Sequence, residues 1–421
     1  MITPEFELLV RCCGIARSIL IDSALTQNQI PEQFNENLFV RLAIQHKTAA
    51  TALTGLKKMG LDLKPENTSK LKQFALQGRM LRELILEDAF AITQAASKAG
   101  IQVLVLKGPA SSLQLYGDAL TREYTDLDIL VNLYTIEPAL PFMSSLGWEA
   151  KDYHPTMKSS LATNKLIIQA HHVIFWKKGC PFRVELHNRA GWEREPFVRD
   201  SIDEVFARAV QLEQGGRAFF APALPDHAVL IIAHGTTHAW VLLHWLLDAV
   251  AIITDPGLKQ RRGRVIQSDT ELYCGIADRI RILDMQCQLK LAYELVKKLY
   301  LINLPLALES AIICQASLEK SVAFAFARLK TAASDIETLR NIFAYQFNYV
   351  YPFFKKDKDW FYSMLSMFKI SMQDAEAFPL PRPLLFIHLL LRPFFALSRV
   401  MKRNHKRKAG VYRTGGSPNP E

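Results

Sequence analysis

The most informative part of the chain is a short apolar run that carries two aspartates, residues 126–131, Asp-Leu-Asp-Ile-Leu-Val. Its length and apolar residues indicate a buried strand, and alternate side chains of a strand share a face. We therefore expect Asp126 and Asp128 on one face and Leu127 and Ile129 on the other. Two neighbouring carboxylates are costly to bury unless a cation lies between them. Because hard divalent ions prefer oxygen ligands, the pair predicts a metal site.

A second predicted strand supplies a third carboxylate. Residues 183–187, Arg-Val-Glu-Leu-His, alternate in the same way, so Glu185 is expected to share a face with Arg183 and His187. If this strand lies beside residues 126–131, three carboxylates converge. Such a cluster can hold two Mg²⁺ ions about 3.5–4 Å apart, one binding a triphosphate and one activating an attacking hydroxyl.

The order of the predicted elements indicates an α+β protein, in which a small mixed sheet with flanking helices is embedded between helical N-terminal and C-terminal regions. Strands are predicted over residues 101–106, 126–131, 171–177 and 183–187, and helices over 110–116 and 135–146. We divide the chain into a helical N-terminal region (1–98), a catalytic core (99–200), one or more helical C-terminal domains (201–400) and a basic, disordered tail (401–421).

Helical spacing of apolar residues dominates both flanks of the sheet region. A helix over residues 67–98 is predicted to begin with Asn67 or Thr68 as its cap. C-terminal helices are predicted to start near residues 225, 269, 318 and 335, after a Gly-Gly break at residues 215–216. Residues 228–247 carry no formal charge and are long enough to cross a bilayer, but their histidines and threonines favour a buried helix of a soluble protein.

The charge balance favours anionic partners. With 51 Lys and Arg against 41 Asp and Glu, the chain carries a net charge of +10, which suits nucleotides, nucleic acid or an acidic membrane surface. No nucleic-acid-binding motif accompanies this charge, so nucleic acid is disfavoured as a partner. An apolar segment, residues 383–400, precedes the basic run 402–408, and this arrangement leaves open a peripheral contact with a membrane surface.

The cysteines and the N-terminus favour a cytoplasmic protein. The six cysteines show no Cys-x-x-Cys spacing, so we expect reduced and mostly buried thiols. The first residues, Met-Ile-Thr-Pro-Glu-Phe-Glu, lack the basic flank and the apolar run of a secretory signal. A peripheral position at the inner face of the membrane is the alternative to a wholly cytoplasmic one.

Several motifs together resemble a known family. They are Lys107-Gly108, Leu113, Tyr116, Arg122, residues 126–131, Glu185-Leu-His187, His234-Gly-x-x-His238-x-Trp240 and Trp245-Leu-Leu-Asp248. The chain is similar to the bacterial nucleotidyltransferase-like proteins, a poorly characterised branch of the polymerase-beta-type superfamily, from about residue 81 to residue 397. This resemblance implies transfer of a nucleoside monophosphate from a nucleoside triphosphate (NTP), with ATP as the expected donor, and release of pyrophosphate.

The resemblance also implies roles for individual residues. Asp126 and Asp128 would bind both Mg²⁺ ions, while Glu185 would bind the catalytic ion and help to activate a hydroxyl of a small-molecule, peptide or protein acceptor. Lys107 and Arg122 would neutralise the charge of the triphosphate.

The phosphate-binding turn departs from the usual pattern of the superfamily. The turn at Gly108 would bring backbone N–H groups and a helix N-terminus to the phosphates. Where the superfamily usually has Gly-Ser or Gly-Gly, this chain has Gly108-Pro109, which removes one N–H and one hydroxyl. Ser111 or Ser112, one turn later, would be the substitute.

A second group of motif residues follows helical spacing. His234 and His238 lie four positions apart, and Trp245 and Asp248 extend the same stripe. The spacing invites a zinc interpretation, but no glutamate follows the first histidine and no third ligand lies at a typical interval. Hydrogen bonding within the helical region, or lining of the cleft over the nucleotide, is favoured instead.

The sequence leaves three functions to compare. The leading one is a Mg²⁺-dependent nucleotidyltransferase. A catalytically weak nucleotide-binding or scaffold protein, at the membrane surface in one version, is motivated by the Gly108-Pro109 turn. A polymerase or tRNA-modifying enzyme would fit the positive charge, but no nucleic-acid-binding motif supports it.

Overall fold

The computed structural model describes residues 2–19, 30, 33–132, 139–150, 172–187, 202–254, 269–314, 316–331, 349–350, 353, 387 and 391. The helices and strands given below all belong to one compact unit. The predicted tail (401–421) and the helix near residue 335 lie outside the described residues, as does the 383–400 segment apart from Ile387 and Leu391.

The N-terminal region is helical, as its periodicity predicts. It consists of α1 (Pro4–Ala16), α2 (Glu36–Gln45), α3 (Ala49–Met59) and α4 (Pro65–Lys98). The predicted cap of the last helix is wrong, because α4 begins two residues earlier at Pro65, whose fixed φ suits the first helical turn. Asn67 lies inside this turn, and its Nδ2 donates to Glu36 Oε2 at 3.0 Å.

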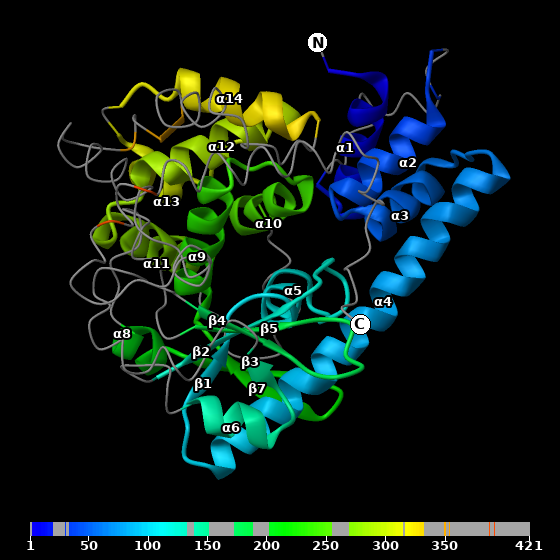
Figure 1. The fold of residues 1–421 in the computed structure, drawn as a ribbon. Helices are drawn as coiled ribbons and strands as arrows, with labels where there is room; N and C mark the ends of the chain where they lie inside the picture. The colour runs from blue at the N-terminus through cyan, green and yellow to red at the C-terminus, as the bar shows by residue number, and fades with distance from the viewer. Residues whose placement is uncertain are drawn as a thin grey trace. The chain divides into compact units, whose positions relative to one another are not determined.

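Five strands form one mixed sheet in the order β1-β2-β5-β4-β3 (Figure 1). The strands are β1 (Val103–Val105), β2 (Leu127–Val131), β3 (Glu149–Ala150), β4 (His172–Trp176) and β5 (Val184–His187). The central pair, β2 and β5, is parallel, and the other three pairs are antiparallel. Helix α5 (Pro109–Tyr116) lies between β1 and β2 in the chain, and α6 (Ala139–Ser145) precedes β3. The predicted α+β fold with a small mixed sheet is thus confirmed.

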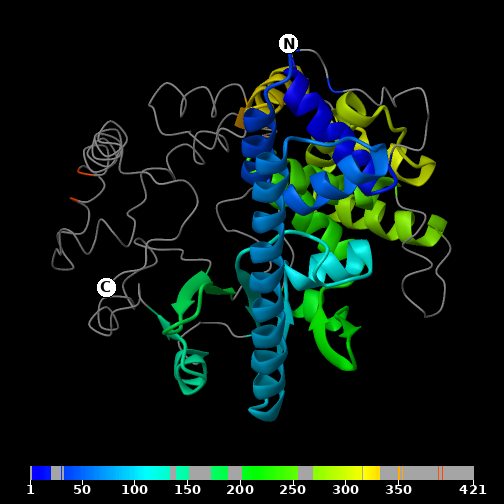
Figure 2. The ribbon, with the colours of Figure 1, turned by 90° about the vertical axis from the view of Figure 1, so that its right-hand side faces the viewer.

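Strand β2 is buried along its whole length because both of its faces are covered. On one face, Leu127 and Ile129 belong to the main hydrophobic core with Ile85 and Ala89 of α4. Figure 2 shows α4 running from the N-terminal helices to the sheet. On the other face, Leu130 packs in a smaller cluster with residues that include Val205 of α8 (Ile202–Ala207). Asp128 alternates with Leu127 and Ile129, so its side chain belongs to the face opposite α4.

The Gly-Gly break at residues 215–216 is the turn of a β-hairpin and does not separate helices. Strands β6 (Val210–Gln214) and β7 (Arg217–Ala221) pair antiparallel across it. Gly215 and Gly216 both have positive φ values, 58° and 73°, which a tight two-residue hairpin turn requires. The prediction that residues 201–400 are helical, with only a break at the two glycines, is therefore wrong for the hairpin.

The uncharged run at residues 228–247 is not one helix. Helix α9 (Leu224–Thr237) ends before His238, and α10 (Leu243–Thr254) begins after a tight turn. The remaining helices are α11 (Asp269–Ile282), α12 (Gln286–Tyr300), α13 (Leu306–Glu309) and α14 (Glu319–Leu329), with the 3₁₀ helix η4 (Ser310–Ile312) after α13. Within the described part of the chain, each helix is too short or too polar to span a lipid bilayer.

All six cysteines are free thiols in the structure. Cys12 and Cys13 are buried in α1, and burial raises the pKa of Cys12 to about 12. The expectation of mostly buried thiols is wrong for the others, since Cys274 is exposed and the remaining three are half-buried.

Candidate functional site

The parallel register of the two central strands places two carboxylates side by side. Asp128 of β2 is the direct partner of Glu185 of β5. Both side chains are buried, with exposed fractions of 5% for Asp128 and 8% for Glu185. Two carboxylates in such a position repel each other, which favours a cation between or beside them.

His187 completes the acidic pair on the same face of β5. Its Nε2 lies 3.0 Å from Asp128 Oδ1 and 4.0 Å from Glu185 Oε2. Asp128, Glu185 and His187 each offer one ligand atom, and these atoms lie within 4.8 Å of one another. Carboxylate and imidazole together suit a divalent metal ion. The alternation of residues 183–187 predicts His187 on this face, although the sequence did not favour it as a ligand.

Asp126 lies next to Asp128, Glu185 and His187 but does not belong to this group of ligand atoms. It precedes the first residue of β2 and is half-buried. Arg183 joins it to the group, because Arg183 Nη2 lies 3.5 Å from Asp126 Oδ2 and 2.7 Å from Glu185 Oε1. Three predicted carboxylates therefore gather at one edge of the site, held partly by a guanidinium group that the sequence did not single out as a site residue.

Lys107 follows β1 by two residues and contacts the same oxygen of Asp128 as His187 does. Its Nζ is 3.3 Å from Asp128 Oδ1. Gly108 follows in a conformation that favours glycine (φ 59°, ψ −114°), and a Cβ there would lie 3.4 Å from the carbonyl oxygen of Asp126. Pro109 is the first residue of α5. The glycine thus lets the Lys107 turn approach the strand that carries the aspartates.

The charges of the cluster shift its pKa values in opposite directions. Burial raises the pKa of Glu185, and the neighbouring Asp128 and Asp126 raise it further. Burial acts in the same sense on Asp128, but Lys107 and His187 outweigh it and lower its pKa far below the ordinary value. For Lys107, burial is outweighed by Asp128, Asp126 and Glu185, which raise its pKa. One carboxyl of the pair therefore binds a proton more readily than the other.

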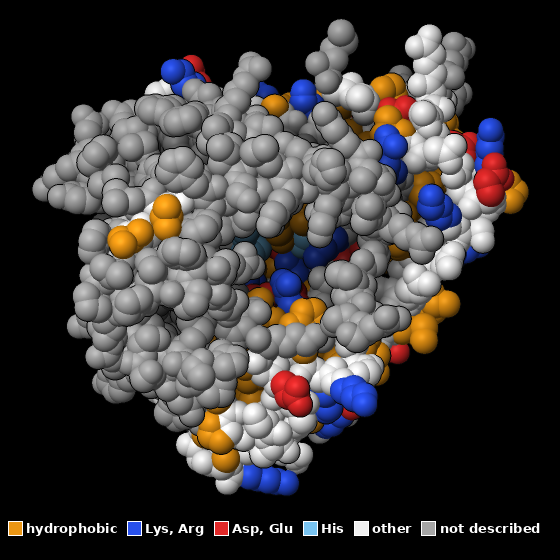
Figure 3. All heavy atoms as spheres, viewed as in Figure 1, with side chains coloured by type: hydrophobic (Ala, Val, Ile, Leu, Met, Phe, Trp, Pro, Cys, Tyr) orange, Lys and Arg blue, Asp and Glu red, His pale blue; other side chains and the backbone are white. Residues whose placement is uncertain are grey.

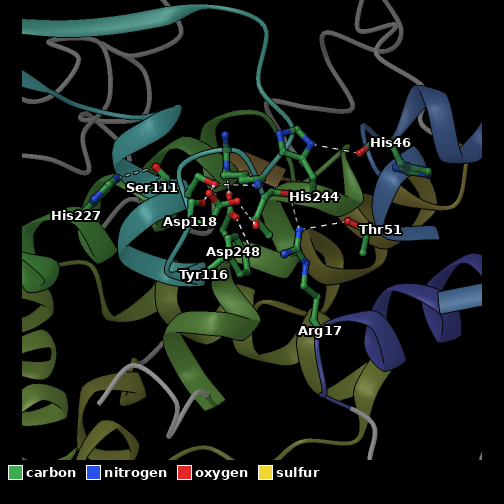
Figure 4. A network of polar contacts seen from close by, with 12 residues as sticks. Arg17, His46, Thr51, Ser111, Tyr116, Asp118, His227, His244 and Asp248 are labelled. Carbon is green, nitrogen blue, oxygen red and sulfur yellow. Dashed lines mark hydrogen bonds and ion pairs between the residues drawn. The ribbon is translucent and has the colours of Figure 1, made fainter. Parts of the chain in front are cut away.

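Arg122 is turned toward helix α10. Its Nε donates to Asp248 Oδ2 at 2.7 Å, and the hydroxyl of Tyr116 donates to Asp248 Oδ1 at 2.8 Å. Figure 4 shows Asp248 and Tyr116 within a network of polar side chains that also includes Arg17, whose Nη2 donates to Thr51 Oγ1 at 3.2 Å. Arg122 and Asp248 are both buried, so their ion pair ties the segment before β2 to α10.

The hydroxyls of the two serines in α5 also bond within the protein. Ser111 Oγ lies 2.8 Å from His227 Nε2 (Figure 4). His227 Nδ1 lies 2.8 Å from Gln114 Oε1. Ser112 Oγ donates to the carbonyl oxygen of Asp118 and accepts from the backbone N–H of Arg122. Because both serines are fully buried, a phosphate contact by either hydroxyl would require these bonds to break.

The histidine motif surrounds the turn between α9 and α10. Ala239 and Trp240 have positive φ values of 51° and 50°, and the buried Trp240 ring lies where a side chain of Gly235 would be. A Cβ on Gly235 would lie 2.4 Å from this ring. The glycine of the motif is thus explained by packing, and the turn folds the chain back at His238.

The turn brings together rings from both helices. The ring centroids of His234 and His238 are 4.6 Å apart, and Trp245 of α10 lies 5.0 Å from His234 and 5.2 Å from His238. The predicted stripe along one continuous helix is wrong, yet these residues do meet. Figure 3 shows Lys, Arg and His side chains gathered in a hollow of the face viewed there.

Comparison with known proteins adds one finding. The model of a family described as uncharacterised nucleotidyltransferases matches residues 32–267, more than half of the chain. This range contains the sheet, the Lys107 turn, the acidic cluster and both helices of the histidine motif. No curated protein and no solved structure shows significant similarity. The chain therefore belongs to this family of uncharacterised nucleotidyltransferases.

Proposed function

We propose that the protein is a Mg²⁺-dependent nucleotidyltransferase, which moves a nucleoside monophosphate from an NTP, with ATP as the expected donor, to a hydroxyl of a small molecule, peptide or protein. The observation that carries the proposal is the direct pairing of Asp128 with Glu185 on parallel strands, with His187 on the same face. Family membership supports the general reaction.

The donor atoms of the cluster fit a divalent metal ion. Asp128, Glu185 and His187 present ligand atoms within 4.8 Å of one another, and Asp126 adds a carboxylate nearby. We propose that Asp126, Asp128 and Glu185 hold two Mg²⁺ ions. Bound metal ions would supply electrostatic stabilisation for the negative charge of the reacting phosphates. His187 would donate to Asp128 from Nε2 in one tautomer, and in the other its Nε2 lone pair would be a further ligand.

The chain's own residues divide the remaining tasks. The acceptor oxygen would form a bond to the α-phosphorus while the bond from this phosphorus to the bridging oxygen of the β-phosphate breaks, and pyrophosphate leaves. Glu185, whose pKa is raised by burial and by Asp128, is suited to receive the proton of the acceptor hydroxyl. Lys107 and the turn at Gly108 would lie against the triphosphate. Arg122 and Ser111 are proposed to support the site through Asp248 and His227.

A second candidate is a nucleotide-binding or scaffold protein with weak catalysis. It is favoured by the phosphate turn, where Pro109 lacks an N–H and the hydroxyls of Ser111 and Ser112 bond elsewhere. A weaker contact with the donor phosphates would reduce turnover and could leave metal-dependent binding intact.

The test is pyrophosphate release from each of the four common NTPs with Mg²⁺ or Mn²⁺, with and without an extract that supplies acceptors. The wild-type protein should release pyrophosphate, and Asp128→Ala should reduce the rate at least about a hundredfold. Asp62→Ala removes an exposed carboxylate that is distant in sequence from Asp128. It is the matched control and should release pyrophosphate at the wild-type rate.

Equal rates from Asp128→Ala and wild-type protein would contradict the enzymatic proposal. Metal-dependent NTP binding without turnover, under all acceptor conditions, would favour the second candidate.

A further inference from the structure

Three aromatic side chains form a continuous ring surface at the turn between α9 and α10. His234, His238 and Trp245 contact one another with centroid distances of 4.6, 5.0 and 5.2 Å. All three are half-buried, whereas the neighbouring Trp240 and His244 are buried. This ring surface is therefore accessible from outside the protein, and it is held in place by packed neighbours.

The histidines of the ring surface differ from the other histidines nearby. His227 on the same helix has both ring nitrogens at 2.8 Å from a polar partner, and His187 Nε2 lies 3.0 Å from Asp128. Within the described part of the chain, the ring nitrogens of His234 and His238 make no hydrogen bond with protein groups, although both side chains are half-buried. Polar groups in such a position are expected to bond with water or with a ligand.

Two contacts tie the helices that carry the ring surface to segments close to the acidic cluster in the chain. His234 lies seven residues after His227, hence on the same side of α9, and His227 bonds with Ser111 at the start of α5. Trp245 lies one turn before Asp248 on α10, and Asp248 binds Arg122. His234 is close enough to Lys107 and Asp128 for their charges to act on it. Figure 3 shows histidine and basic side chains together in one hollow.

Burial favours the neutral form of both histidines in the ring surface. Burial, with a contribution from Lys107, lowers the pKa of His238 to about 4 and that of His234 well below its ordinary value. Neutral imidazole has little attraction for a triphosphate, but its flat face stacks on other rings and its two nitrogens can donate and accept hydrogen bonds. Such chemistry suits a planar heterocycle with polar edges.

We infer that the ring surface of His234, His238 and Trp245 binds the nucleobase of the NTP donor. The inference rests on the proposed function and deepens it, because it assigns a binding site to the nucleobase, the part of the donor that the phosphate-binding residues would not contact. Stacking on aromatic side chains contributes about 1–3 kcal/mol per base, or roughly five- to 150-fold in affinity. The base would lie near Lys107, whose charge acts on both histidines.

The experiment compares an NTP with inorganic tripolyphosphate, which has the same phosphate chain without a base. Dissociation constants of the full-length protein for ATP, GTP, CTP, UTP and tripolyphosphate are measured by titration calorimetry with Mg²⁺. At least one NTP should bind about tenfold or more tightly than tripolyphosphate. His234→Ala/His238→Ala and Trp245→Ala should lose most of this ratio and keep the tripolyphosphate affinity. Phe220→Ala removes an exposed aromatic ring on β7 and should keep the ratio.

The results separate the two levels of the proposal. A wild-type ratio near one, or an unchanged ratio in the ring variants, would overturn the assignment of the base site and leave the proposed function standing. Absence of binding by every NTP and by tripolyphosphate would overturn both. If the alanine variants fail to fold, the milder His234→Gln and Trp245→Phe variants should still reduce the ratio, with tripolyphosphate binding as the check on folding.

Discussion

Asp128 and Glu185 are direct partners on adjacent parallel strands, and the same face carries His187 3.0 Å from Asp128. Because like charges directly opposite each other in a sheet destabilise it, the arrangement lowers the stability of the metal-free protein. The same arrangement makes a bound cation favourable. The repulsion between the two carboxylates thus lowers the stability of the metal-free protein and favours metal binding, and both effects can be measured.

Replacing Glu185 with Gln should stabilise the metal-free protein. At about pH 8 with a chelator present, Glu185→Gln should raise the free energy of unfolding by up to about 1 kcal/mol, because the repulsion with Asp128 is removed. The same variant should lose the increase in Tm that Mg²⁺ or Mn²⁺ gives the wild type. Thermal unfolding with and without metal measures both effects. A destabilised metal-free variant would contradict the repulsion.

The effect of Glu185 should depend on pH in a defined direction. Its pKa is raised above the ordinary 4.5, so the folded state binds this proton more tightly than the unfolded state. Its contribution to stability is therefore fully present below 4.5 and is lost as the pH rises through the raised value. Asp128 has the opposite sign, since its lowered pKa makes a contribution that disappears only as the pH falls below 3.8.

From these signs we expect the Tm difference between Glu185→Gln and wild-type protein, both in chelator, to shrink as the pH falls from about 8 to about 5. Thermal unfolding at four or five pH values within this window measures the difference. A difference that stays constant would show that Glu185 does not titrate in this window.

Gly235 should tolerate no side chain. Gly235→Ala would place a Cβ 2.4 Å from the Trp240 ring, and overpacking of this kind costs about 1–3 kcal/mol. Gly275→Ala is the matched control, because it also lies within a helix and its Cβ would lie 3.4 Å from Pro225 Cγ, an ordinary contact. The control should be neutral or slightly stabilising, since alanine favours helices. Urea unfolding compares the two variants, and equal midpoints would contradict the packing explanation.

Removing Asp248 should destabilise the fold strongly. Asp248→Ala leaves the buried guanidinium of Arg122 without its carboxylate, and breaking a buried ion pair costs about 3–5 kcal/mol. Tyr116→Phe removes only the second hydrogen bond to Asp248 and should cost about 1 kcal/mol. Urea unfolding of both variants checks this order. A loss for Asp248→Ala no larger than that for Tyr116→Phe would show that the ion pair is not needed for stability.

Much of the acidic cluster could be predicted from the sequence because strand alternation is a local rule. It assigns Asp128 and Glu185 to defined faces and explains why Leu127 packs against α4. Alternation does not reveal which strand lies beside which. The parallel pairing of β2 with β5, and hence the direct opposition of the two carboxylates, depends on the topology of the whole sheet.

The histidine motif shows a limit of local rules. Residues 238–242, His-Ala-Trp-Val-Leu, contain neither glycine nor proline, so nothing in them indicates a turn. Ala239 and Trp240 adopt positive φ values because the Trp240 ring packs onto Gly235, a tertiary contact. The ion pair between Arg122 and Asp248 likewise joins residues 126 positions apart. The glycine pair at residues 215–216, in contrast, is itself a local signal, because two consecutive glycines suit both a break between helices and a tight hairpin turn.

The bridge that Arg183 forms between Asp126 and Glu185 bears on how the protein matures. Together with Lys107, it sets two cations against three carboxylates, so these cations offset most of the negative charge before any metal ion arrives and one negative charge is left over. The site therefore forms without a metal ion. An ion would bind to the folded protein by competing with Lys107 and Arg183 for the carboxylates. Newly synthesised protein would not need a metal supply to reach its native state, and loss of the metal would be reversible.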